Sequence, residues 1–581
     1  MFRSRFLLGA AALIVALLTL TAAIMAAPAD PPAPRFYLPL IGRGMAFPLL
    51  PPTPLPPASH PGLPLSRFAT DDFSGPFVCA NCHANLTDAG GHDVTMSTQW
   101  RASTMANAAR DPLWQAKVSA EIARHPELQA EIEATCSRCH MPMAYTQALV
   151  KGQTPAIFGE NGFLNPAHPL HQAAMDGVSC TLCHQIQPDG LGTPASFSGH
   201  FAIETSTTPP QRTLFGPYPD PDGMGAMIMR QGSAYNPRQG QHLTGSALCA
   251  TCHTLFTNHA LAANGDNGFP EQVPYLEWLH SSYGDGQGQD RQCQDCHMPV
   301  AQGAVAIYPG WPQHEPFYQH HFVGGNLFML KILQAHVGEL GLTASTADFE
   351  AAIERTRAQL QEQTAEITIP AFVQDQNLLR ATVRVANQSG HKFPTSYPAR
   401  RAWLHLTASD AEGRVFFESG RPLSDGGIVA NDADLDPTSF EPHYTRILAP
   451  TQVQIYEAIM ADAAGNPTFT LLDAAAYAKD NRLLPAGFDK TTALPAIAVI
   501  GGAATDADFT GGADEVIYEI DAAGRPGPYQ LKVELLYQSL MAGFVQDLRL
   551  SNTPQVERFG RYFDQADKTP IRIDAVEVVG P

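Results

Sequence analysis

Five copies of the motif Cys-x-x-Cys-His constrain this chain more than any other feature of its sequence. In this motif two thiols form thioether bonds to a haem, and the adjacent imidazole binds the haem iron as proximal ligand. The sequence therefore predicts five covalently bound c-type haems. The motif cysteines are Cys79, Cys82, Cys136, Cys139, Cys180, Cys183, Cys249, Cys252, Cys293 and Cys296. The predicted proximal histidines are His83, His140, His184, His253 and His297.

The cysteine count favours haem over the other chemistries of paired cysteines. The five motifs use all ten cysteines of the chain, so none remains for a disulfide bond. A zinc site combines two Cys-x-x-Cys units, or one unit with distant histidines, and a thioredoxin-like redox pair needs no following histidine. A histidine after every pair is typical of haem attachment.

The length and charge of the chain limit its partners. With 581 residues and a formal net charge of −20, the chain is long enough for about two to four domains. So negative a charge argues against binding to nucleic acid, which requires a basic face. We expect redox donor and acceptor proteins as partners, although the charge also serves solubility alone.

The N-terminus has the pattern of an export signal. Arg3 and Arg5 precede an almost wholly apolar run from Phe6 to Ala27. Residues 1–27 are therefore either a signal peptide or an N-terminal anchor, the one predicted membrane contact. The Pro-rich residues 28–65 predict an extended linker. Because c-type haem is attached outside the cytoplasmic membrane, motifs and leader both predict an exported protein, located in the periplasm, at the cell surface or outside the cell.

Residues 66–367 are predicted to form a loop-rich, mainly helical pentahaem domain with C-terminal helices. Successive motif histidines lie 57, 44, 69 and 44 residues apart. Segments this short do not build separate cores, so the haems are expected to act as buried apolar mass. The apolar spacing predicts helices within 97–135, with Pro112 starting one of them, and over 327–339 and 346–366. Residues 205–240 are expected to wrap the surface.

From about Thr368 the apolar residues alternate with a period of two. Short runs of this kind between Gly, Asn and Asp turns are typical of an antiparallel β-sandwich. Residues 368–581 are therefore predicted to form a β-sandwich-like domain, and the fold class of the whole chain is α+β and multidomain.

The motifs and their flanking residues resemble a known family. The similar stretches are Gly177 to His184, Cys293 to Pro299, His320-His321-Phe322 and Gly390 to Thr395. In these stretches the chain resembles multihaem c-type cytochromes related to the tetrahaem cytochromes and hydroxylamine-oxidoreductase-like proteins. The resemblance covers roughly residues 73–398 and implies electron transfer outside the cytoplasm. Some family members have an open haem where small nitrogen or sulfur compounds react.

The resemblance also implies candidates for the second, distal axial ligands. These residues lie in Gly-, Pro- or aromatic-flanked turns similar to ligand positions of the family, and each is alternatively a surface or hydrogen-bonded histidine. The candidates are His171, His242, His320, His321 and His391. If His391 binds an iron, coordination fastens the β domain to the haem domain.

Met105 is the candidate distal ligand of the first haem. Related proteins often place a histidine after a Trp-x-x-Ser pattern, whereas this chain has Met105 after Trp100 and Ser103. A thioether ligand raises the reduction potential relative to histidine. The alternatives are that Met105 only packs against haem and that His92 is the ligand.

Two further groups of residues each have two possible roles. The oxygen-rich loop from Asn431 to Asp436 is a candidate Ca²⁺ site, but it lacks the Gly and Glu of an EF-hand, which favours a solvated acidic turn. Arg400 and Arg401 are candidates for pairing with haem propionates or, equally, for ordinary ion pairs. The sequence contains no catalytic triad, P-loop or dinucleotide-binding motif.

The sequence leaves three functions open. The first is an electron relay through closely packed haems, and we expect an electron-transfer protein rather than a substrate-converting enzyme. The second is an oxidoreductase that acts on a small nitrogen or sulfur compound at one open haem. The third is a subunit of an extracellular cytochrome filament.

Overall fold

The computed structural model describes residues 59–208, 211–258, 268–308, 310–434 and 436–580. The predicted leader and the linker up to residue 58 lie outside the described residues, so the predictions for them stay predictions. Within the described ranges, no helix is both long enough and apolar enough to cross a membrane.

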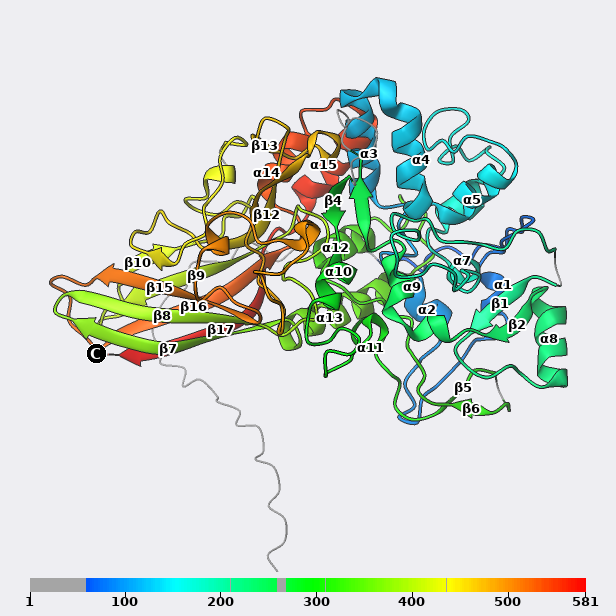
Figure 1. The fold of residues 1–581 in the computed structure, drawn as a ribbon, viewed down its shortest axis with the longest axis horizontal. Coiled ribbons are helices and arrows are strands. Elements are labelled where there is room, and N and C mark those ends of the chain that lie inside the picture. Colours follow the sequence, from blue (N-terminus) through cyan, green and yellow to red (C-terminus); the bar gives the residue numbers. More distant parts are fainter. Residues whose placement is uncertain (1–58, 209–210, 259–267, 309, 435, 581) are drawn as a thin grey trace, which may run out of the picture. The chain divides into compact units, whose positions relative to one another are not determined.

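The region of the five motifs consists of short helices connected by long loops (Figure 1). Its helices are α1 (Phe77–Ala80), α2 (Met96–Trp100), α3 (Pro112–Arg124), α4 (Gln129–His140), α5 (Pro142–Val150), α6 (His171–Met175), α7 (Cys180–Cys183), α8 (Gly223–Ser233), α9 (Ser246–Ala250), α10 (Pro274–Leu279), α11 (Cys293–His297), α12 (Leu327–Ala335) and α13 (Thr346–Glu362). The strands of this region form two-stranded pairs: β1 (Thr213–Gly216) with β2 (Asn236–Gln239), β3 (Leu255–Thr257) with β4 (Phe269–Gln272), and β5 (Val305–Ala306) with β6 (Gln313–His314).

Local sequence signals account for the helix starts that were predicted. Helix α3 begins at Pro112, and the Asp111 carboxylate caps it by accepting the N–H groups of Leu113 and Trp114. Helix α13 begins after Ser345, which forms a reciprocal capping box with Asp348. Both arrangements satisfy N–H groups that have no partner inside the helix.

Residues after α13 form two packed sheets, as the period-two pattern predicts. The first sheet has the order β11-β15-β8-β7 and the second the order β13-β12-β9-β16-β17, with β10 on β9 and β14 on β12. Most pairings are antiparallel, and β11 with β15 is parallel. The strands are β7 (Ala365–Asp375), β8 (Leu378–Asn387), β9 (Arg401–Ser409), β10 (Val415–Ser419), β11 (Arg446–Ile447), β12 (Ile455–Ala461), β13 (Pro467–Thr468), β14 (Ala476–Asp480), β15 (Ala513–Asp521), β16 (Tyr529–Gln538) and β17 (Ile571–Gly580).

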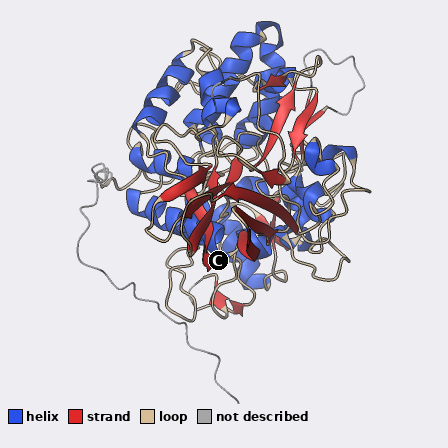
Figure 2. Cartoon of the chain, turned by 90° about the vertical axis from the view of Figure 1, so that its left-hand side faces the viewer, coloured by secondary structure: helices blue, strands red, loops and turns tan. Residues whose placement is uncertain are grey.

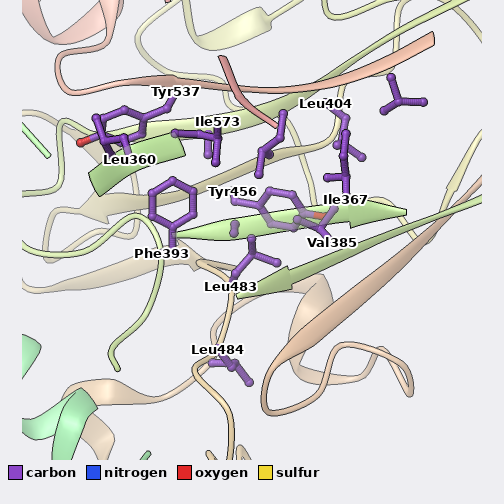
Figure 3. Packing of buried hydrophobic residues seen from close by; sticks show 14 of the residues in the cluster. Leu360, Ile367, Val385, Phe393, Leu404, Tyr456, Leu483, Leu484, Tyr537 and Ile573 are labelled. Carbon is purple, nitrogen blue, oxygen red and sulfur yellow. The ribbon is translucent and has the colours of Figure 1, made fainter. Parts of the chain in front are cut away.

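The core of this sandwich comes from alternate residues of the facing strands. Val383 and Val385 of β8 are buried, as are Leu404 of β9 and Val533 of β16, and all belong to one apolar cluster that Figure 3 shows from close by. Figure 2 shows the strands in red with helices in blue beside them. The combination of helices and mainly antiparallel sheets confirms the α+β class.

Two helices interrupt the sandwich between its last two strands. Helices α14 (Ala542–Leu548) and α15 (Pro554–Gln565) follow β16, and α15 packs against α3 of the motif region. Neither helix was predicted, because the surrounding sequence has the period-two pattern of strands. Their signals are present, since Thr553 caps α15, Pro554 stands at its first position, and Val556, Phe559 and Phe563 form a buried stripe.

Truncating this stripe should destabilise the protein. Phe559 is 1% exposed within the cluster that joins α15 to α14 and α3, so Phe559→Ala should lower the free energy of unfolding by about 3–5 kcal/mol. Leu550, which is 74% exposed, is the matched control. Leu550→Ala should change the free energy of unfolding by less than about 0.5 kcal/mol. Urea denaturation followed by circular dichroism measures both, and equal effects would contradict the packing of α15.

Candidate haem-binding site

Each Cys-x-x-Cys-His motif lies on or beside a helical turn. Cys79 lies on α1, the second motif ends α4, the third forms α7, the fourth follows from α9, and the fifth forms α11. The spacing i, i+3, i+4 places side chains on one face of such a turn. The two thiols and the imidazole of each motif therefore point to the same side.

The five motifs open onto one cavity of about 1530 Å³. All five motif histidines line it, and so does every motif cysteine except Cys136. Pockets for a single small molecule usually measure about 300–1,000 Å³. The space and its donors therefore suit several large apolar groups rather than one small ligand.

Backbone carbonyls orient four of the five motif histidines. In each of them the ring atom Nδ1 donates to a carbonyl oxygen. His83 donates to Ile307 (2.7 Å), His140 to Ala108 (3.3 Å), His184 to Phe215 (2.6 Å) and His297 to Val323 (2.5 Å). A donating Nδ1 leaves the lone pair on Nε2 for a metal, which is the second-shell arrangement of most metal-binding histidines. These contacts fit haem iron as the group that the motifs hold.

Two motif histidines face a second imidazole at the spacing expected across an iron. The ring centres of His184 and His320 are 6.4 Å apart with planes 17° apart, and those of His297 and His391 are 6.2 Å apart with planes at 16°. Two metal–nitrogen bonds of about 2 Å, plus about 1.1 Å from nitrogen to ring centre on each side, give on the order of 6 Å. His391 also donates from Nδ1 to the Lys392 carbonyl at 2.9 Å, which again leaves Nε2 for a metal.

Burial keeps these imidazoles neutral. It lowers the pKa of His140 and of His253 to about 4 and that of His320 to about 3, and it also lowers the pKa of His184, His297 and His391. Only the neutral ring offers a lone pair to a metal. The histidines are therefore ready to bind iron over the whole neutral pH range.

Contacts between thiols give the order of the motifs in space. Cys79 of the first motif is hydrogen-bonded to Cys180 of the third, which raises the pKa of the Cys79 thiol. In the same way Cys139 of the second motif meets Cys252 of the fourth, and Cys249 of the fourth meets Cys293 of the fifth.

The third and fourth motifs are also close to each other. Burial raises the pKa of Cys183, of the third motif, to about 12, and the nearby thiol of Cys252, of the fourth, adds to this shift. The spatial order is therefore first, third, fourth, with the second and fifth motifs both beside the fourth.

The structure separates the candidate distal ligands into two groups. Met105, His320, His321 and His391 line the cavity. Met105 lies near the second and third motifs, because its carbonyl accepts the Val178 N–H and the nearby Ala108 carbonyl accepts from His140.

The other two candidates lie outside the cavity lining. His171 donates from Nδ1 to the Phe163 carbonyl at 2.8 Å, and His242 donates from Nε2 to the Ile186 carbonyl at 2.9 Å. His92, the alternative for the first haem, is exposed and paired with Asp88. Ligation by these residues stays a prediction.

The two arginines have different surroundings. Arg400 lines the cavity and donates to the Thr395 carbonyl at 3.2 Å, so it can reach an acidic group there. Arg401 is buried in the sandwich, where it pairs with Asp434 at 2.8 Å and with Gln538 at 3.0 Å. Of the pair, Arg400 fits the propionate reading and Arg401 fits the ordinary ion pair.

The carboxylate oxygens of Asp434 and Asp436 in the acidic loop accept hydrogen bonds from protein groups. One oxygen of Asp434 accepts from Arg401 and the other from the Ile428 N–H, while Asp436 accepts from Thr438. These bonds favour the acidic turn over a Ca²⁺ site, and Ca²⁺ stays a prediction.

Helix α8 forms a part of the cavity wall that was not predicted from the sequence. Gly225, Ile228, Met229, Gly232 and Ser233 of α8 line the cavity at spacings of three and four, although this stretch was expected only to wrap the surface. The available signal was the helical spacing of Ile228 and Met229 from Gly225 and Gly232, which lie three or four residues away on either side. The charged residues near His391, which are Glu277, Lys392, Asp480 and Arg482, come from three distant segments and gave no such signal.

The comparisons with known proteins are distant. No protein-family model matches the chain, and no curated protein matches it. Among solved structures, it is similar to a penta-heme cytochrome c552 from Thermochromatium tepidum, with a TM-score of 0.48 and 19% sequence identity over 86% of this chain and 97% of that chain. This likeness is too weak to transfer a function.

A second group of metal-ligand residues lies in the sandwich, at His443, Asp506 and Asp514. His443 Nδ1 accepts from the amide nitrogens of Gln454 (2.9 Å) and Asn481 (3.1 Å). Both amides are fixed in this orientation, because the oxygen of each accepts a backbone N–H. His443 therefore carries its proton on Nε2 and donates it to Asp506 at 2.9 Å, which leaves no lone pair for a metal.

The buried carboxyl of Asp514 should make stability depend on pH. Burial raises its pKa from 3.8 to about 7, so between these values the folded state holds a proton that the unfolded state has released. Stability then falls as pH rises through this window. Asp514→Asn keeps an acceptor for the Tyr456 hydroxyl and removes the titration.

Urea denaturation at pH 5 and pH 8 checks this expectation. The free energy of unfolding of Asp514→Asn should rise relative to the parent protein as pH increases. A constant difference between the two proteins would contradict the assignment of a proton to Asp514.

Proposed function

We propose that this chain is an exported multihaem c-type cytochrome that relays electrons between a donor and an acceptor protein. When bound, haem iron supplies a one-electron redox change that side chains of this composition lack. The observation that carries the proposal is the convergence of five Cys-x-x-Cys-His motifs on one cavity, with imidazole pairs across it at axial-ligand spacing.

The residues of the chain have distinct roles in this proposal. The ten motif cysteines would attach the haems, and the five motif histidines would hold the irons, with carbonyls on Nδ1 of four of them. His320 and His391 would supply the second protein ligands of the haems held by His184 and His297. Met105 and His321 are the proposed distal donors for other haems, since both line the cavity.

The spatial order of the motifs supports a relay. Each motif contacts another through its thiols, so no haem would stand apart from the rest. The order first, third, fourth, fifth runs from α1, which contacts α8, to the motif whose His297 faces His391. A relay of this kind needs contact between neighbours and no substrate pocket.

An oxidoreductase with one open haem is the second candidate. Imidazole pairs at axial spacing accompany the third and fifth motifs among the described residues. At the second motif, Trp114 stacks on the proximal His140 with ring centres 4.6 Å apart, and the segment around Met105 approaches from the side of Ala108, the carbonyl partner of His140. The first, second and fourth motifs have no such imidazole pair among the described residues, and of these three we propose the second for an open position.

Haem attachment can be tested by mass and absorbance. The purified protein should carry five haem masses, and Cys293→Ala/Cys296→Ala should carry four, with about one fifth of the Soret absorbance lost, because each motif attaches one haem. His297→Met is the matched control, since it changes the ligand but keeps both thiols. A bare chain mass would end the proposal.

Carbon monoxide binding separates the relay from the enzyme. A relay whose irons all have two protein ligands should bind no carbon monoxide rapidly in the reduced state, whereas an open haem should bind one equivalent. A weak near-red absorption band that Met105→Ala abolishes would identify Met105 as a ligand. Rapid one-to-one binding, together with turnover of hydroxylamine, nitrite or sulfite, would favour the enzyme.

A further inference from the structure

Four charged side chains form a buried network beneath the loop that carries His391. They are Glu277 of α10, Lys392 next to His391, Asp480 at the end of β14, and Arg482. Their side chains are between 0% and 5% exposed. Two positive and two negative charges therefore lie out of water at one place, with a net charge of zero.

The network is closed by short contacts. Lys392 Nζ lies 2.7 Å from Asp480 Oδ2, and Arg482 Nη2 lies 2.8 Å from the same oxygen. Arg482 Nη1 lies 3.0 Å from Glu277 Oε1. Arg482 thus connects the two carboxylates, and each positive group has at least one carboxylate partner.

Glu277 also holds the backbone of the loop. Its Oε2 accepts the Lys392 N–H at 3.1 Å and the Thr395 hydroxyl at 2.5 Å. Between them, Phe393 exchanges backbone hydrogen bonds with Leu483 at 2.9 and 2.8 Å. Phe393 also packs against Tyr537 in the sandwich core, with ring centres 5.6 Å apart (Figure 3). The residues directly after His391 are therefore fixed on both sides.

Stability alone does not explain four buried charges. Desolvation of ions offsets much of their attraction, so well-packed apolar residues are often as stable as a buried ion pair. Removing one partner, in contrast, leaves an uncompensated charge in a medium of low polarity. The network is therefore a device that keeps the surroundings of His391 both rigid and neutral.

We propose that Glu277, Lys392, Asp480 and Arg482 act as positioning residues that hold His391 opposite His297 and set the reduction potential of the fifth haem. The inference deepens the proposed function and rests on it, because His391 must bind the iron opposite His297. Through this network the β-sandwich controls the potential at one end of the relay.

The proposal predicts potential shifts of opposite sign. Glu277→Gln removes a negative charge, and the remaining positive charge favours the reduced iron, so the potential should rise. Lys392→Met leaves a negative charge, so the potential should fall. A merely structural role would loosen His391 in both variants and shift the potential in one direction.

The experiment is a potentiometric titration of the full-length holoprotein followed by optical and electron paramagnetic resonance spectra. The spectral component changed in His391→Met identifies the fifth haem. Each single variant should change its ratio of reduced to oxidised haem about tenfold at a given ambient potential, or about 59 mV for one electron. The double variant Glu277→Gln/Lys392→Met restores neutrality and should return the potential toward the parent value.

Asp434→Asn is the matched control. It breaks the buried pair of Asp434 with Arg401, whose side chains are 6% and 1% exposed and lie 2.8 Å apart. The other hydrogen bonds of Arg401 go to Gln538 and Gly426, not to the loop that carries His391. This variant should lower stability and leave the potential of the fifth haem unchanged. Shifts of the same sign in both single variants, or none, with all five haem masses present would overturn the inference alone, whereas missing haem masses would overturn the proposed function.

Discussion

The structure depends on five motif imidazoles that line one cavity, and desolvation lowers the pKa of four of them, His140, His184, His253 and His297. The helical turn of each motif brings its histidine to the same side as its thiols, and burial favours the uncharged ring. A carbonyl acceptor on Nδ1 then decides which nitrogen is left for a metal. Phe215 and Val323 each form two hydrogen bonds with the histidine that they orient. The carbonyl accepts from the ring, and the backbone N–H donates to the backbone carbonyl of that histidine. The sequence around the motifs is thus organised to present Nε2 atoms rather than to close a core of its own.

The apolar side chains of the motif region support this view of the cavity. One cluster includes Phe73, Met143 and Phe163, and a separate one includes Leu86 and Phe317. The cavity is lined by residues from both sides of this division. Large apolar groups attached at the motifs would provide the buried surface that these small clusters lack, since burial of apolar area is the main stabilising term in folding. Attachment of the cofactor and completion of the core are then the same event in the proposed protein.

The sequence predicted local features of this chain better than its long-range connections. The predicted proximal histidines all line one cavity, and the period-two pattern predicted strands where the structure has them, because both signals are local. Iron binding by these histidines stays a prediction. Helix α15 was missed although Thr553 and Pro554 mark its start, because a helix inside a run of strands contradicts the prevailing pattern. The partnership of Glu277 with Lys392 and Arg482 has no local signal at all, since it depends on three segments that only the fold brings together. The separation of Arg400 from Arg401 is similar, because Arg401 is the first residue of β9 and Arg400 lies in the loop before it.

The same long-range connections make the sandwich part of the site rather than an appendage. Helix α15 packs on α3 next to the second motif, while the loop after β8 brings His391 to the fifth. The second and fifth motifs both lie beside the fourth, which the third motif approaches as well, so the second and fifth are two alternative ends of the series. A relay from the first motif through the third and fourth needs only one of these ends as an exit. The fifth has an opposed imidazole held by a rigid neutral network, which suits a fixed potential at an exit.

The second lies off that path, and its Cys136 is the one motif cysteine outside the cavity lining, so a reacting small molecule there would draw electrons from the relay without interrupting it. The two candidate functions are therefore compatible within one chain, and they differ in whether the haem of the second motif has an open position.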